Sequence, residues 1–186
     1  METPRDAIAS LGVAMTLNQA LALSLDVGRQ LQVDSLRALA SQHHGIALAV
    51  AREAQRLAIR VGKDPVGFQQ AGLLSRIGEM AVLKVLNQYV TTGGELDENE
   101  AERALTQWAQ SYGNRLKVQW RLPLGMRELI GSVHYLPTDC TREDRLIMRA
   151  AAMMAGGEQN SGECQRLLRR IGLDPADNAG RQDGDD

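Results

Sequence analysis

Residues 71–80 read AGLLSRIGEM, and in this stretch a hydroxyl and a guanidinium, those of Ser75 and Arg76, interrupt an otherwise apolar run. The run belongs to a predicted helix that begins with Pro65 at its first position and ends at the TTGG of 91–94. Apolar residues on both sides of the two polar ones are expected in the core. A polar pair buried at this place needs a structural or chemical reason.

The same helical spacing of apolar residues runs through the rest of the chain, and no segment alternates as a strand does. Helices are predicted near residues 4–11, 13–27, 34–61, 65–91, 97–112, 123–136, 141–154 and 167–171. N-terminal caps are expected at Thr3, Asp64, Asp97 and Thr141. The predicted fold is therefore an all-α, compact bundle of about eight helices.

Composition places the chain among globular proteins of ordinary domain size. It has 186 residues, of which 44% are hydrophobic and 24% charged, and its net charge is −2. Residues 1–173 are predicted to form one domain, and the acidic, Gly-containing stretch 174–186 a disordered tail. Because no run of about 18 apolar residues and no signal peptide is seen, we expect a cytoplasmic protein that does not enter a membrane.

Few residues of the chain suit metal or nucleophilic chemistry. Its two cysteines, Cys140 and Cys164, form no metal-binding spacing and are expected to be free thiols. Of the three histidines, His43 and His44 are adjacent, so on a helix they point about 100° apart. His43 falls on the apolar stripe of its helix, whereas His134 lies near a helix end, where it can interact with the last carbonyl groups.

Three motifs occur in the order and spacing of a known family. They are TPRDAIASLG, then, after a long helix, AGLLSRIGEMAVL, and finally WRLPLGMRELIGSVHYLP. Together they resemble the HDOD domains (HD-related output domains) of the HD superfamily of metal-dependent phosphohydrolases, over roughly residues 3–155. The third motif matches the family at Trp120, Leu122, Pro123, His134 and Pro137. The resemblance implies a bacterial, all-α signalling domain.

The second motif departs from the family pattern at the position of its metal ligands. The usual family string is similar to AGLLHDIG, and here Ser75 and Arg76 hold the positions of its His and Asp. Ser75 is a weak neutral ligand, and the guanidinium of Arg76 offers no lone pair and would repel a divalent cation. It could instead stand in for the charge of the ion and satisfy a nearby carboxylate. No metal and no other cofactor is therefore expected.

These observations favour a catalytically inactive signal-transduction module that binds a protein partner or a small ligand. The candidate binding residues at the degenerate HD site are His43, Ser75, Arg76 and His134. The alternative is an HD-type metal-dependent phosphohydrolase with unconventional ligands such as His43, His134 and Asp139. Direct binding of nucleic acid is disfavoured by the net charge, since only the short arginine run near 166–170 could form a basic face.

The resemblance also implies helices upstream of Thr3 that this chain lacks. Such helices would cover part of the segment 7–25, AIASLGVAMTLNQALALSL, which is apolar on more than one side. A helix that is apolar around most of its circumference needs cover on most of it. We therefore expect an exposed apolar face that self-associates or docks onto a partner in a bacterial signalling pathway.

Overall fold

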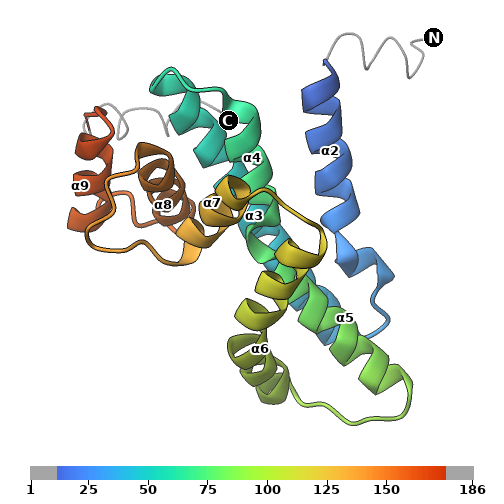
Figure 1. Cartoon of the computed structure of the whole chain (residues 1–186). Helices are drawn as coiled ribbons and strands as arrows, with labels where there is room; N and C mark the ends of the chain where they lie inside the picture. The colour runs from blue at the N-terminus through green and yellow to red at the C-terminus, as the bar shows by residue number, and fades with distance from the viewer. Residues whose placement is uncertain (1–11, 175–186) are drawn as a thin grey trace, which may run out of the picture. The chain divides into compact units, whose positions relative to one another are not determined.

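The computed structural model describes residues 12–174, and every regular element in that part of the chain is helical (Figure 1). The all-α prediction is thereby confirmed. The helices are α2 (Val13–Leu25), α3 (Asp34–Arg60), α4 (Pro65–Leu73), α5 (Ile77–Thr91), α6 (Glu98–Gln119), α7 (Leu124–His134), α8 (Glu143–Ala155) and α9 (Gly162–Arg170), with 3₁₀ turns η1 (Val27–Gln30) and η2 (Leu74–Arg76). The helix predicted near 4–11 and the predicted tail fall outside the described residues, apart from position 174.

The chain divides into two compact units, each made from two separate stretches. Residues 1–48 and 73–123 form the first unit, which contains α2, the start of α3, η2, α5 and α6. Residues 49–72 and 124–186 form the second, which contains the end of α3, nearly all of α4, and α7 to α9. The single domain predicted over 1–173 stays a prediction.

The first unit is built on the close packing of α5 against α6. A Cβ atom added to Gly78 would lie 2.0 Å from the carbonyl oxygen of Ala109, so glycine is what lets the two backbones approach. The start of α3 is tied to α5 by Asn87, whose Oδ1 accepts the backbone N–H groups of Gln32 and Val33 at 2.8 and 3.2 Å. Around these contacts lies a core of Val27, Leu31, Leu36, Ala40, Met80, Val82, Leu83, Ala101 and Leu105.

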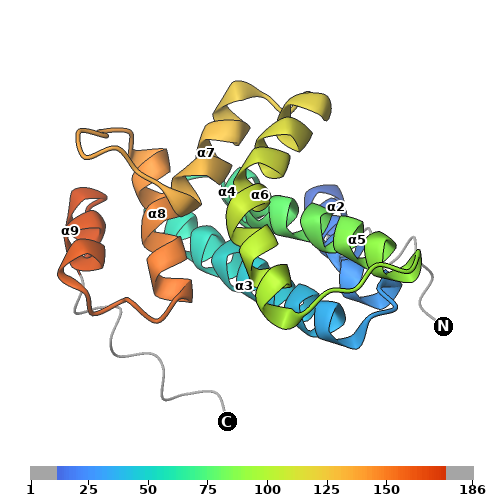
Figure 2. The same cartoon turned by 90° about the horizontal axis from the view of Figure 1, so that it is seen from below.

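The second unit packs α7 and α9 against α8 (Figure 2). On its other side α4 meets α3, where a Cβ atom added to Gly72 would lie 2.4 Å from the Cα of Ala51. Three fully buried side chains of α8 and α9, Ile147, Met148 and Leu168, fill its interior. No helix within residues 12–174 has the length and apolar character needed to cross a membrane.

Three predicted helix details are wrong. The helix predicted over 65–91 is broken at η2, where the backbone of Arg76 leaves helical geometry with φ −114° and ψ 21°. The helix starting after Asp97 does not stop near 112 but continues to Gln119, because no proline or turn sequence interrupts it before Pro123. Thr141 does not cap α8; its N-cap is Arg142, which makes no capping hydrogen bond through its side chain.

Candidate functional site

The stretch 71–80 forms the junction between α4 and α5. Leu73, Leu74 and Ile77 are all buried, as expected for core residues. Ser75 is also buried, with 3% of its surface exposed, and lies in the η2 turn beside Arg76. The turn therefore carries a hydroxyl and a guanidinium into the interior of the first unit.

Arg76 forms an ion pair with a carboxylate that the sequence analysis did not single out. Its Nη1 donates to Oε1 of Glu79 at 2.8 Å, and the two side chains are only 26% and 10% exposed. A buried carboxylate is stable only when it is paired and hydrogen-bonded. The expectation that the guanidinium satisfies a nearby carboxylate is therefore confirmed. The spacing of three residues on a helix was the signal that could have predicted the pair.

His43, on α3, lies near enough to this pair for both of their charges to act on its imidazole. Burial lowers the pKa of its imidazole, the carboxylate of Glu79 acts in the opposite direction, and the charge of Arg76 lowers the pKa further. The net shift is downward from 6.5, so the ring is neutral at pH 7. Its Nδ1 is buried and has no hydrogen-bond partner among the described residues. Nε of Arg76 is likewise buried and unbonded within the described part of the chain.

The fourth predicted residue, His134, belongs to the second unit. It is the last residue of α7 and is exposed, as is Asp139 in the loop that follows. The first unit thus contains His43, Ser75 and Arg76, together with Glu79.

These residues do not fit a divalent cation. The imidazole of His43 and the carboxylate of Glu79 are metal-ligand groups, but the carboxylate is already paired with Arg76. The guanidinium of Arg76 offers no lone pair and brings a positive charge. Within residues 12–174, no group of three or more His, Cys, Asp or Glu side chains is placed to hold a metal ion.

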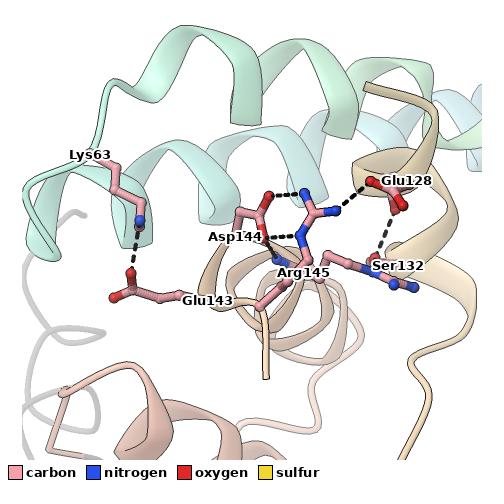
Figure 3. A network of polar contacts seen from close by, with 7 residues as sticks. Lys63, Glu128, Ser132, Glu143, Asp144 and Arg145 are labelled. Carbon is pink, nitrogen blue, oxygen red and sulfur yellow. Dashed lines mark hydrogen bonds and ion pairs between the residues drawn. The ribbon is translucent and has the colours of Figure 1, made fainter. Parts of the chain in front are cut away.

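A second polar cluster joins α7 to α8 in the second unit (Figure 3). The guanidinium of Arg142 donates to Glu128 at 2.6 Å and to both oxygens of Asp144 at 3.3 and 2.7 Å. Ser132 accepts from Nε of Arg145 at 3.0 Å and donates to the carbonyl of Glu128 at 2.8 Å. Burial alone would raise the pKa of Asp144, but the hydrogen bonds from Arg142 and the backbone N–H of Arg145 outweigh it and lower the pKa.

Further polar contacts of the second unit also join segments distant in sequence. Lys63, after α3, pairs with Glu143 at the start of α8 at 2.8 Å (Figure 3). Arg149 donates to the carbonyl group of Val133 near the end of α7 at 3.1 Å. Arg170 of α9 donates to the carbonyl group of Cys140, so this member of the predicted basic run serves the fold. We interpret these contacts as structural.

An apolar groove lies between α5 and α6 in the first unit. Its volume is about 230 Å³, and it is lined by Val82, Val85, Leu86, Ala104, Trp108 and Tyr112. Trp108 is 48% exposed although it belongs to the apolar stripe of α6. The apolar residues of α6 are therefore of two kinds: Ala101 and Leu105 are buried, whereas the aromatic rings of Trp108 and Tyr112 remain accessible.

The architecture of residues 12–174 is all-helical, with a polar cluster at the turn between α4 and α5. The family model for the HDOD domain matches residues 1–136. The chain belongs to the HDOD family. Neither a curated protein nor a solved structure was found to match it.

Proposed function

We propose that this HDOD protein is a catalytically inactive signalling module that acts by binding a protein partner or a small ligand. The observation that carries the proposal is the ion pair between Arg76 and Glu79. It lies at the motif where the family resemblance places a His-Asp pair, and it fills that place with a fixed positive charge.

Metal-dependent phosphoester hydrolysis requires a cation that lowers the pKa of a bound water molecule. Holding such a cation takes about three protein ligands with lone pairs. Here the guanidinium of Arg76 brings a repelling charge, and it occupies the carboxylate of Glu79 that a cation would need. The chemistry of the side chains therefore supports a binding role rather than hydrolysis.

The proposal is tested on the unchanged full chain. Elemental analysis after purification with added Mn²⁺ or Zn²⁺ should find no stoichiometric metal, and bis(p-nitrophenyl) phosphate should not be hydrolysed above the rate of a His43→Ala, His134→Ala double variant. About one metal ion per chain, lost in that variant together with hydrolysis, would instead establish the phosphohydrolase with unconventional ligands.

The binding role requires a surface open to a partner, and α2 provides apolar side chains for it. Val13, Leu17 and Leu23 are 67%, 59% and 69% exposed. Exposed apolar groups that gather on one element mark interaction sites more often than solvated surface. The partner that we favour for this face is a second protein molecule, either another copy of the chain or a component of a signalling pathway.

A further inference from the structure

We infer that the C-terminal end of α6 is a contact surface for an acidic segment of a partner protein, and that Arg121 keeps a strained backbone because its side chain serves this contact. The basic-aromatic surface consists of Arg115, Val118, Gln119, Trp120 and Arg121, all of which are exposed. The inference rests on the proposed binding role of the chain, and it adds a place and a kind of partner.

The backbone of Arg121 is strained. Its φ of 53° lies in the left-handed region, and among residues 12–174 it is the only residue other than glycine with a positive φ. The corresponding position after α3 is Gly62, so a turn of this kind does not need a side chain. Strained backbone persists mainly at binding sites and other functional positions.

Contacts within the protein do not account for the arginine at this position. The side chain of Arg121 is exposed, and no hydrogen bond or ion pair joins its guanidinium to another described residue. By contrast, Arg145, Arg149 and Arg170 each donate to a group on a neighbouring segment. The guanidinium of Arg121 is therefore available to a molecule outside the chain.

The charge around Arg121 has one sign. From residue 103 to residue 123 the chain contains no aspartate or glutamate, whereas Arg115, Lys117 and Arg121 fall within seven positions. Unopposed cations on a surface are complementary to a partner that carries carboxylates. The net charge of the whole chain is −2, so this basic character is local.

Two apolar side chains accompany these charges. Val118 is 59% exposed and Trp120 is 48% exposed. Tryptophan and arginine are the residues that most often dominate the affinity of a protein contact. Basic membrane anchors carry about four to eight cations, and nucleic-acid binding also depends on many phosphate contacts, so three cations beside a tryptophan favour a protein partner of mixed acidic and apolar residues.

The experiment measures binding of a fluorescein-labelled peptide of glutamate and leucine residues to the full chain by fluorescence anisotropy. The unchanged chain should bind the peptide, and the affinity should fall as NaCl is raised from 50 to 300 mM. Trp120→Ala should weaken binding at least tenfold and Arg121→Gly about fivefold. Arg121→Gly should at the same time raise the urea midpoint of unfolding, so that its loss of binding cannot be ascribed to a less stable fold.

Three further variants separate charge from backbone conformation. Arg121→Lys keeps the charge and should bind within about twofold of the unchanged chain. Arg121→Gln keeps a side chain on the left-handed backbone but loses the charge, and it should bind as weakly as Arg121→Gly. Arg166→Gln removes an exposed arginine from the second unit and should leave the affinity unchanged.

Three results would overturn the inference. One is no binding of the peptide by the unchanged chain at 50 mM NaCl, and another is equal binding by Arg121→Gly. The third is tighter binding of phosphatidylglycerol vesicles or of a DNA duplex than of the peptide, lost in the same variants, which would assign the surface to a membrane or to nucleic acid. These outcomes are separate from those of the proposed function, which is decided by metal and hydrolysis in the unchanged chain.

Discussion

His43 links the polar cluster at η2 to pH. Because burial, helped by the charge of Arg76, lowers its pKa against the opposing effect of Glu79, the folded chain binds a proton on this ring less readily than the unfolded chain does. The stabilising contribution of neutral His43 is therefore complete above about pH 6.5, the pKa of an unperturbed histidine, and is lost as the pH falls from there towards the lower pKa of the folded state.

A His43→Gln variant should consequently lose less stability than the unchanged chain between pH 7.5 and pH 5.5. The measurement is the urea midpoint of unfolding at the two pH values, which tracks the free energy of unfolding when the slope is constant. His134→Gln makes the same exchange on an exposed side chain of the second unit and is measured in parallel for comparison. Equal pH dependence in His43→Gln and the unchanged chain would contradict the interpretation of the buried ring.

At the scale of single residues, the sequence could predict part of the site. Arg76 and Glu79 stand three positions apart in a helical pattern, so their pairing could have been predicted from spacing alone. The approach of His43 does not follow from spacing, because it depends on how α3 packs within the first unit; only the family resemblance placed His43 at this site. His134 was grouped with these residues through the family resemblance, and that grouping stays a prediction.

Helix ends could be predicted where neighbouring residues in the sequence form the capping hydrogen bonds. Asp97 and Glu100 form the expected capping box, with hydrogen bonds of 2.7 and 3.0 Å between each side chain and the other's backbone N–H. The break at η2 was not predictable in this way. It lies between Gly72 and Gly78, each of which is in close contact with the backbone of another helix. The break therefore occurs where helices pack closely, and helix propensity alone does not predict it.

The end of α6 carries a residue in a conformation that favours glycine. Arg121 has a φ of 53°, and the N–H groups of Arg121 and Leu122 donate to the carbonyls of Val118 and Lys117. This is the hydrogen-bond pattern of a Schellman motif, whose left-handed position is usually glycine. The same pattern ends α3, where the corresponding residue is Gly62 with a φ of 73°.

Arg121→Gly should therefore stabilise the protein by about 1 kcal/mol, because a side chain in left-handed geometry costs roughly that much. Gly62→Ala is the matched reverse change, and it should destabilise by a similar amount for the same reason. Both are measured as shifts in the free energy of unfolding in urea. A destabilising Arg121→Gly would show that the side chain of Arg121 contributes contacts worth more than the backbone strain.

The close approach of α5 and α6 can be tested by substituting the glycines at their crossing. Gly78→Ala should destabilise by roughly 3 kcal/mol, because the new methyl group would lie 2.0 Å from a backbone oxygen that cannot move without shifting α6. Gly113→Ala, on the facing side of the same crossing, meets its nearest atom at 3.4 Å and gains helix propensity, so it should be nearly neutral. Thermal denaturation of the two variants compares them directly. Similar Tm values would show that the two helices separate easily.

At the scale of the whole molecule, α2 carries three of the large apolar side chains that are exposed among the described residues. Val13 and Leu17 lie one turn apart and Leu23 lies further along, and each keeps more than half of its surface exposed. Asn18 of the same helix is 1% exposed, so α2 buries part of its circumference while Val13, Leu17 and Leu23 remain available. The prediction of an apolar surface on the segment 7–25 is thus confirmed for its described part, and self-association through it stays a prediction.

The chain should self-associate at micromolar concentration through the exposed side of α2. Burial of apolar surface contributes about 25 cal/mol per Å², but three side chains fall short of the roughly 800 Å² per partner of a standard stable interface. The predicted association is therefore weak and concentration-dependent. Static light scattering from 5 to 200 μM should show a mass that rises with concentration, and Leu17→Glu with Leu23→Glu should hold the mass at 20.3 kDa.

Tyr135→Glu provides the control for that experiment. Tyr135 is as exposed as Leu23, at 69%, but it lies in the second unit, so the substitution places one glutamate at an exposed apolar position outside α2. If association runs through α2, this variant should associate as the unchanged chain does. Two results together would show that α2 is not a docking surface for another copy. The first is a mass of one chain throughout the concentration range, and the second is binding of an apolar dye that does not differ between the unchanged chain and the α2 variant.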